Sequence, residues 1–392
     1  MPATCNVASN VHDRLLDRNR IFEKFFAEQA VPLAAACREM SDRFLRGGRL
    51  LAFGRGPYAT DAQHVSVEFV HPIIVGKRAL PALDLSLLFR PWLDAILRPE
   101  DIVMGFGPPE GDAEVTDALF SARQRGAMTF ELPGCGGSYS FQPPDANPFV
   151  HQELMEILYH TLWETVHVFF EHRELGYDVG DSAFLYPFLG DQKQSTDNIV
   201  EQVATSIRIK AQEDAMLRAQ VGAKDSEQIA NAARAIHERL TRGGKLILFG
   251  NGGSATDAND FAIDCVFPPA GYRPVAAISL SMEPANLTAI ANDVGIELIF
   301  LRQMIAQARS EDVAVGISTS GGSRNVIMAL EEARKRGLLT VALLGYDGGE
   351  IVQRGLVDFP LVVRSDYIPR IQEVQASTYH VIRETLEVLE GA

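Results

Sequence analysis

The chain has 392 residues, more than one ordinary hydrophobic core needs, and this length predicts two domains. Its formal net charge of −15, from 36 Lys and Arg against 51 Asp and Glu, argues against broad binding to nucleic acids or anionic membranes. Hydrophobic residues make up 46% of the chain, and no apolar run approaches the length of a transmembrane helix. We therefore expect a globular protein with neither nucleic-acid nor membrane partners.

Cysteine spacing and the N-terminal sequence indicate the compartment. The four cysteines show no CxxC spacing, which favours reduced, structural thiols (Cys5, Cys37, Cys135 and Cys265). The first residues, MPATCNVASNVHDR, lack a basic region followed by an apolar core, so we expect no secretory signal. Both features predict a cytoplasmic protein.

An internal repeat organises the chain. After a predicted helix over residues 11–47, the segment RLLAFGRGPYATDAQHVSVEF from Arg49 aligns with KLILFGNGGSATDANDFAIDC from Lys245. The alignment continues from Asp101 against Asp312 and from His151 against Ile371. The chain is therefore predicted to contain two copies of one α/β domain, residues 1–190 and 191–392.

The junction between the copies is predicted near Leu185 to Asp197. The second copy is then expected to open with two helices, roughly over residues 198–220 and 226–242. Each copy alternates strands with helices, which predicts a parallel sheet covered by helices on both faces. The expected fold is thus doubly wound and flavodoxin-like in each half.

A glycine-rich turn in the second copy has the features of an anion site. Residues 246–249 predict a buried strand, Asn251-Gly252-Gly253 break it, and Ser254 is predicted to cap a helix starting at Ala255. Backbone N–H groups and the positive end of the helix dipole would then meet at one point. The alternative is a tight strand-to-helix turn without a ligand, since such turns are common.

A second loop repeats this arrangement with hydroxyl groups. Residues 313–317 predict a buried strand and residues 324–336 a helix, with STSGGS between them. The hydroxyls of Ser318, Thr319, Ser320 and Ser323 can surround a phosphate together with backbone N–H groups. A simple turn with a helix cap would need only one or two of these hydroxyls.

The motifs GNGGS and STSGGS together resemble the sugar isomerase (SIS) fold, and specifically the phosphoheptose isomerase family. Further matches are LTAIANDVGIE at 287–297, LLGYDGGEI at 343–351 and the segment from Arg370 to His380, so the resemblance covers about residues 195–392. It implies isomerisation of sedoheptulose 7-phosphate, or a similar sugar phosphate, through an enediol, without a nucleotide cofactor. It also implies Asp293 and Gln372 as sugar-binding residues, and a homo-oligomer in which two-domain chains pair as a pseudo-tetramer.

The first copy departs from the phosphate loops of the second. Pro57-Tyr58 stand where the second copy has Gly253-Ser254, and GPPEGD at 107–112 replaces STSGGS. Proline removes N–H donors, while Glu110 and Asp112 place negative charge where a phosphate would lie. We therefore expect the first copy not to bind phosphate in this mode.

Metal-ligating and acid–base positions show the opposite pattern. In family members that bind zinc, the resemblance implies ligands at the positions of His64, Glu68, Gln152 and His160, all of which the first copy retains. The second copy has Asp260 and Asp264 at the first pair and keeps Gln372 and His380. The alternative is that the Tyr-His pairs at 159–160 and 379–380 are a packing element common to both copies.

The resemblance implies a base that removes the proton beside the sugar carbonyl and an acid that returns it. Glu68 or Asp264 would be the base, and His160 or His380 the acid. The complementary losses suggest a composite site shared by the copies, whereas the alternative is a self-contained site in the second copy. A non-catalytic sugar-phosphate-binding or protein-interaction module is the competing function, favoured by Asp260 and by Pro369, where the family has Asp.

Overall fold

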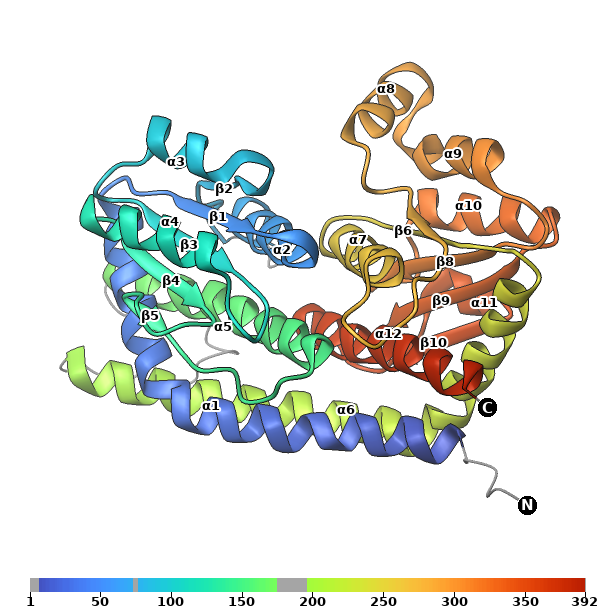
Figure 1. Ribbon diagram of the computed structural model, residues 1–392, viewed down its shortest axis with the longest axis horizontal. Helices are drawn as coiled ribbons and strands as arrows, with labels where there is room; N and C mark the ends of the chain where they lie inside the picture. The colour runs from blue at the N-terminus through green and yellow to red at the C-terminus, as the bar shows by residue number, and fades with distance from the viewer. Residues whose placement is uncertain (1–6, 73–76, 175–195, 392) are drawn as a thin grey trace. The chain divides into compact units, whose positions relative to one another are not determined.

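The computed structural model describes residues 7–72, 77–174 and 196–391 and divides into two compact units (Figure 1). The first-half unit is Arg20–Ala215, and the second-half unit combines Met1–Asn19 with Met216–Ala392. The predicted boundary at residue 190, and nearly all of the predicted junction, lie outside the described residues. Among the described helices, none has both the length and the apolar character needed to cross a membrane.

The first-half unit is built on a five-stranded parallel sheet in the order β2-β1-β3-β4-β5. Its strands are β1 (Leu50–Gly54), β2 (Ala82–Asp84), β3 (Ile102–Phe106), β4 (Met128–Leu132) and β5 (Tyr139–Ser140). Its helices after β1 are η1 (Gly56–Tyr58), α2 (Ala59–Val70), η2 (Ser86–Leu88), α3 (Phe89–Ile96), α4 (Ala113–Gln124) and α5 (Pro148–Glu174). This strand order is that of flavodoxin-like folds.

The second-half unit repeats that order as β7-β6-β8-β9-β10, again with every pair parallel. Its strands are β6 (Leu246–Gly250), β7 (Ala277–Ser279), β8 (Val313–Ser318), β9 (Leu339–Gly345) and β10 (Phe359–Val363). Its helices after β6 are α7 (Gly253–Val266), α8 (Pro284–Val294), η5 (Ile296–Leu298), α9 (Ile299–Gln307), α10 (Arg324–Lys335), α11 (Gly349–Gln353) and α12 (Ile368–Glu390). Both halves therefore contain a five-stranded parallel sheet with the same strand order.

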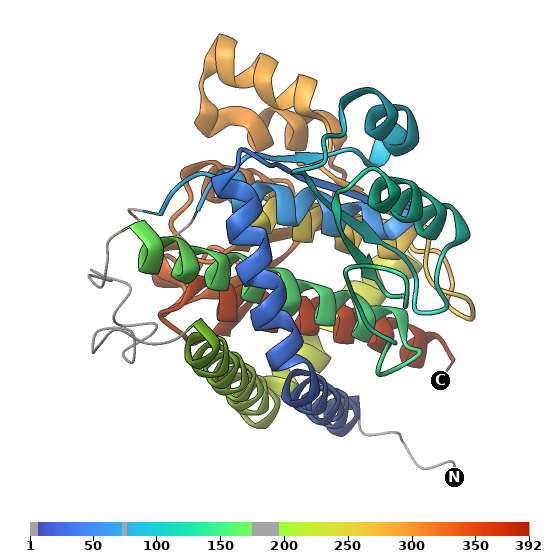
Figure 2. The ribbon, with the colours of Figure 1, turned by 90° about the vertical axis from the view of Figure 1, so that its left-hand side faces the viewer.

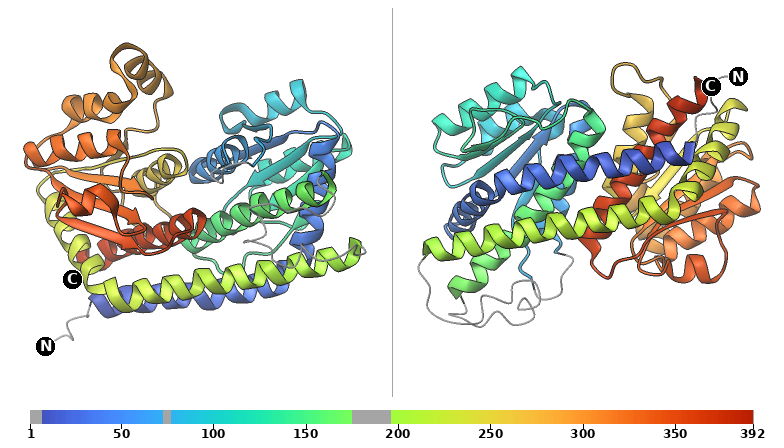
Figure 3. Two further views of the ribbon diagram at one scale, coloured as in Figure 1. Left: turned by 180° about the vertical axis from the view of Figure 1, so that it is seen from behind. Right: turned by 90° about the horizontal axis from the view of Figure 1, so that it is seen from below.

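Helices cover both faces of each sheet, as the continuous apolar runs of the strands require. In the first half, Leu50 and Ala52 pack toward α1, α2 and α5, while Leu51 and Phe53 pack toward α3 and α4 (Figure 2). In the second half, α7 and α12 cover one face and α8 to α10 the other (Figure 3). Alternate residues of each strand therefore enter separate cores, which is the predicted doubly wound arrangement.

Two long helices, α1 (Val7–Leu45) and α6 (Thr196–Thr241), each begin in one unit and end in the other. Apolar residues of the first α1 turns, among them Val11 and Leu15, join the core of the second-half unit. Residues of the first half of α6, including Val203 and Ile207, join the core of the first-half unit. Each unit thus contains a helical segment that precedes the other copy in the sequence.

The prediction of two separate helices before β6 is wrong, because α6 continues through Gly222 without a break. A Cβ at Gly222 would lie 3.3 Å from His12 Nδ1 and 3.7 Å from Leu15 Cβ. The glycine therefore lets α1 approach α6 closely within the second-half unit, and the packing offsets its low helix propensity.

Buried ion pairs at equivalent positions join α1 to α12 in the second-half unit and α6 to α5 in the first-half unit. Arg18 of α1 lies 3.1 Å from the Glu384 carboxylate of α12, and both side chains are buried. Lys210 of α6 pairs with Glu164 of α5 in the first-half unit, again with both groups buried. Glu164 and Glu384 each follow the histidine of their own helix by four residues, so the pairs occupy matching positions in the two halves.

Candidate functional site

The two predicted phosphate loops of the second half leave the carboxyl ends of neighbouring strands. β6 pairs with β8 on one side and with β7 on the other, so the chain reverses direction across the sheet at β6. Ligands of doubly wound folds bind in the crevice at such a switch point. The turn at Asn251 and Gly252 follows β6 and the Thr319–Ser323 loop follows β8, which places both at this switch point.

The first loop turns directly into α7. Gly252 is the N-cap residue of α7 and has a φ of 56°, a left-handed conformation that favours glycine. The prediction that Ser254 caps the helix is wrong, because α7 already begins at Gly253 and Ser254 lies buried in its first turn. Ser281, two residues after the end of β7, holds the start of this loop: its hydroxyl donates to Gly250 O at 3.0 Å and accepts from Gly250 N at 3.2 Å.

The second loop presents its hydroxyl groups around the start of α10. Ser323 is the N-cap residue of α10, and its hydroxyl receives a hydrogen bond from Ser318 Oγ at 3.2 Å. Gly322 N donates to Ser320 Oγ at 3.2 Å, and Thr319 O accepts from Gly345 N at 2.9 Å. Thr319 and Ser323 are half-buried and Ser320 is exposed, so these side chains can be reached by a ligand.

A reciprocal amide pair holds the two loops together. Asn251 Nδ2 donates to Asn325 Oδ1, and Asn325 Nδ2 donates to Asn251 Oδ1, each at 2.9 Å. Both predicted loops therefore form one surface at the N-termini of α7 and α10, where backbone N–H groups and helix dipoles favour an anion. Asn325 was not among the residues predicted from the sequence, although its place in the first turn of α10 could have signalled a role.

In the first half, the N-terminus of the corresponding helix, α4, is already occupied by a carboxylate of the same chain. The Asp112 carboxylate caps α4 by accepting from Glu114 N at 2.8 Å and Val115 N at 3.1 Å. Asp112 also pairs with Arg55 at 3.0 Å. An internal carboxylate thus takes the N–H donors that a phosphate would need, which supports the predicted lack of phosphate binding in this half.

Three of the four predicted metal ligands of the first half lie together between α2 and α5. The ligand atoms of His64, Glu68 and His160 all lie within 4.8 Å of one another, and all three side chains are buried. Burial, together with the charge of Glu164, raises the pKa of Glu68 to about 8. Gln152 is buried on α5 two turns before His160, a rise of about 12 Å along the helix.

This cluster fits a divalent metal in its donor chemistry. Two imidazoles and one carboxylate form a donor set that zinc accepts. Glu68 Oε2 is buried and has no hydrogen-bond partner among the described residues, an arrangement that costs free energy unless a cation or proton satisfies the oxygen. The residues present therefore fit such an ion, with Gln152 as a further predicted ligand.

The matching cluster of the second half is satisfied by its own hydrogen bonds. His380 Nε2 lies 3.0 Å from Asp264 Oδ2 and 3.4 Å from Asp260 Oδ2, and Tyr379 OH donates to Asp260 Oδ2 at 2.8 Å. Burial and the neighbouring Asp260 raise the pKa of Asp264 to about 7. The result is a buried carboxylate–imidazole pair suited to exchanging protons near neutral pH.

Two further residues of the second half, Gln372 and Asp293, were predicted to bind the sugar, and neither belongs to the Asp260, Asp264 and His380 cluster. Gln372 is buried on α12 two turns before His380, and its Oε1 has no hydrogen-bond partner among the described residues. Asp293 is exposed near the end of α8, where it accepts a hydrogen bond from Asn292 at 2.9 Å. Their sugar-binding roles stay predictions.

The chain is similar in sequence to several known proteins. The SIS domain family matches residues 211–345. Phosphoheptose isomerase of Thermodesulfovibrio yellowstonii is 40% identical over 187 residues, 47% of this chain and 92% of the relative. That of Geobacter sp. (strain M21) is 45% identical over 163 residues, 41% of this chain and 84% of the relative.

A solved structure extends the likeness in fold to the whole chain. The C-terminal domain of glucosamine-fructose-6-phosphate aminotransferase from Francisella tularensis matches with a TM-score of 0.63, covering 96% of each chain. Sequence identity to it is only 7%, so this likeness concerns the fold alone.

Proposed function

Because the chain belongs to the phosphoheptose isomerase family, we propose that it interconverts the ketose and aldose forms of a sugar phosphate. Sedoheptulose 7-phosphate, or a similar sugar phosphate, is the proposed substrate. The observation that carries the proposal is the pair of loops at the switch point of the second half, joined by Asn251 and Asn325. Their hydroxyl and N–H groups offer the donors that a phosphate requires.

The chemistry needs one group that removes a proton beside the carbonyl and one that returns it to the neighbouring carbon. Asp264 is a candidate base because its pKa of about 7 lets it accept and release a proton near neutral pH, with His380 Nε2 3.0 Å away. Glu68 and His160 are the corresponding candidates in the first half. Burial of these groups excludes water, which strengthens their electrostatic interactions.

His64, Glu68 and His160, with Gln152 as the proposed fourth ligand, would hold a divalent ion such as zinc. When bound, such an ion polarises carbonyl and enediol oxygens. We further propose a cytoplasmic homo-oligomer in which two-domain chains pair as a pseudo-tetramer, a state that light scattering would measure.

Turnover of sedoheptulose 7-phosphate, measured with and without added zinc, tests the proposal. Thr319→Ala combined with Ser320→Ala should weaken substrate binding at least tenfold, because each hydrogen bond lost to a charged ligand costs about 1.5–3 kcal/mol. Thr241→Ala combined with Ser310→Ala, two exposed hydroxyls outside both loops, is the matched control and should bind as the wild type does. Unchanged calorimetric affinity in the loop variant would refute the phosphate site.

A binding module without turnover is the second candidate. It is favoured by the hydrogen bonds that satisfy Asp260, Asp264 and His380 without a metal, and by the blocked helix start at Asp112. Tight binding of the sugar phosphate without turnover, at any zinc concentration, would identify this function.

A further inference from the structure

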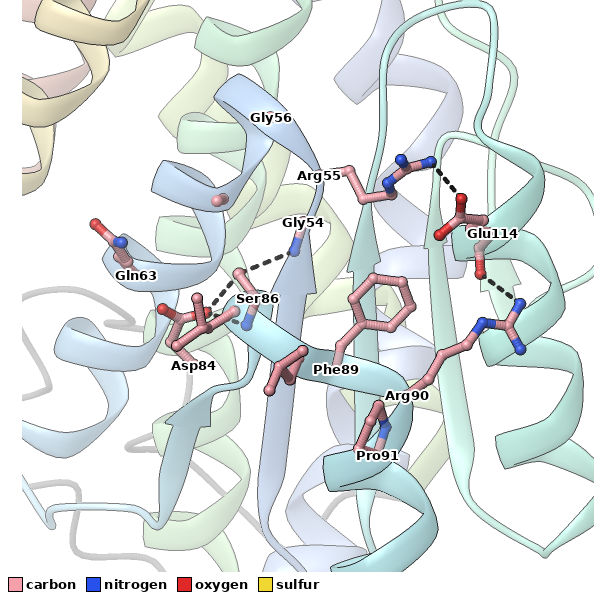
Figure 4. Close-up of a pocket in the computed structure, with 13 residues that line it drawn as sticks. Gly54, Arg55, Gly56, Gln63, Asp84, Ser86, Phe89, Arg90, Pro91 and Glu114 are labelled. Atoms are coloured by element: carbon pink, nitrogen blue, oxygen red, sulfur yellow. Dashed lines mark hydrogen bonds and ion pairs between the residues drawn. The ribbon is translucent and has the colours of Figure 1, made fainter.

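The first-half unit has a pocket at the position that matches the two proposed phosphate loops of the second half. It has a volume of about 570 Å³, within the usual range for small-molecule sites, and lies at the carboxyl ends of β1 and β2 (Figure 4). Its lining includes Arg55, Asp84, Ser86, Arg90 and Glu114. The proposed isomerase reaction assigns no role to it.

The pocket preserves the framework of the second-half crevice. Gly54 N donates to Ser86 Oγ at 3.1 Å, as Gly250 N does to Ser281 Oγ at 3.2 Å. Arg55 lies 3.2 Å from Glu114, and these two residues stand where the repeat places Asn251 and Asn325.

Both halves therefore have a side-chain contact between the two loops, although the two residues that form it differ between the halves. In the second half it is a pair of amides, and in the first half it is an ion pair (Figure 4). A decaying site would lose such a bridge when one partner changed. A matched exchange of both partners indicates a crevice retained for a ligand of different polarity.

The charges of this lining balance one another. Arg55 pairs with Asp112 and Glu114, and Arg90 lies 3.4 Å from Asp117 and donates to Glu114 O at 3.2 Å. A phosphate would have to compete with these carboxylates, which disfavours it. A cation would likewise have to compete with the guanidinium groups for the carboxylates.

The remaining chemistry suits hydroxyl groups. The Asp84 carboxylate accepts from Ser86 N at 2.9 Å and from Ser86 Oγ at 2.5 Å, so a carboxylate and a hydroxyl group lie side by side on the wall. Leu87 and Leu88 add an apolar rim with exposures of 89% and 59%. We propose that this pocket binds a neutral polyhydroxylated ligand, namely an unphosphorylated sugar, as a second site separate from the phosphate loops.

Calorimetry with free sedoheptulose tests the proposal on the full chain. The protein carries Thr319→Ala and Ser320→Ala, so that binding at the phosphate loops is weakened. We expect saturable binding that falls at least tenfold when Arg55→Asn and Glu114→Asn are added, since these changes install the amide pair of the other half. Leu87→Ser, at a rim residue too exposed to affect folding, should also weaken binding.

Three results would overturn the proposal. Free sedoheptulose could give no saturable signal at millimolar concentration. Its affinity could stay the same after both the Arg55/Glu114 exchange and the Leu87 substitution. Sedoheptulose 7-phosphate could bind the loop-deficient protein more tightly than the free sugar and lose that binding in the exchange variant, which would show an anion site instead.

Discussion

Asp264 shows how one side chain changes the chemistry of a repeated position. Its counterpart Glu68 lies beside two histidines and has a buried oxygen without a hydrogen-bond partner among the described residues, whereas Asp264 is hydrogen-bonded to His380. The ligand atoms of both clusters are close enough to hold a metal ion, but among the described residues only the first has an unsatisfied carboxylate oxygen for it, whereas the second is already hydrogen-bonded and suits proton exchange. The second half also has Asp260 at the position that matches His64, and Asp260 contributes to the difference because it accepts a hydrogen bond from Tyr379.

Asp264→Asn should change how stability depends on pH. Because the pKa of Asp264 is raised to about 7, the folded protein holds a proton there that the unfolded chain releases near pH 4. The free energy of unfolding therefore falls as pH rises from about 4 to 7, and asparagine, which does not ionise, removes this part of the fall. Urea unfolding at pH 5 and pH 8 measures it.

The exposed Asp293→Asn is the matched control and should retain the wild-type pH dependence. If Asp264→Asn and Asp293→Asn respond to pH in the same way, the buried carboxyl does not carry a raised pKa.

At the scale of elements, the last helix of each unit depends on a helix that precedes the other copy. Glu384 of α12 is almost completely buried, and its charge is balanced by Arg18 and by Arg14, which lies 2.8 Å away. Both arginines lie on α1. The helix that carries His380 is therefore held by residues at the start of the chain, and not only by those next to it in sequence.

Arg18→Ala should destabilise the protein by about 3 kcal/mol, because removing a buried partner leaves the Glu384 carboxylate poorly compensated. Arg14→Ala should cost at most about 1 kcal/mol, since the Arg14 side chain is 29% exposed and solvent screens its charge. Urea midpoints of the two variants provide the comparison. Adding Glu384→Gln should recover part of the Arg18→Ala loss, and a lack of recovery would mean that packing and not charge is responsible.

On the scale of the whole molecule, the compact units do not follow the order of the copies in the chain. Residues 1–19 belong to the second-half unit. Removing them should therefore increase hydrogen exchange in α12 and β6 of that unit while leaving β1 and β3 of the first-half unit protected. A simple tandem arrangement predicts the opposite, with increased exchange in the first half. Mass spectrometry of the exchanged peptides distinguishes the two patterns.

The two candidate bases can be distinguished by substitution. We expect Glu68→Gln to lower kcat at least a hundredfold, within the usual contribution of a general base, and Asp264→Asn to lower it less. Glu68 is the residue at the family's position, and it is longer than Asp264. The reverse order would assign the base to the second half. Zinc content, measured for each variant, separates loss of metal from loss of the base.

Much of this organisation could be predicted from sequence because it depends on local patterns. The runs at 246–249 and 313–317 are apolar without interruption, so they predicted buried strands, and the glycines and serines after them predicted turns at helix starts. The repeat and the alternation of strands with helices predicted a doubly wound, flavodoxin-like fold in each half. The resemblance implied one site formed by His64, Glu68, Gln152 and His160, and the structure brings His64, Glu68 and His160 together.

Contacts between residues far apart in the chain were decided only by the tertiary structure. No local pattern pairs Arg18 with Glu384, or shows that Gly222 continues a helix because α1 lies against it. The pairing of Asp112 with Arg55, 57 positions away in the sequence, likewise needed coordinates. The spacing of apolar residues along the sequence indicates which face of a helix or strand is buried. Which other element covers that face depends on how all the elements pack together.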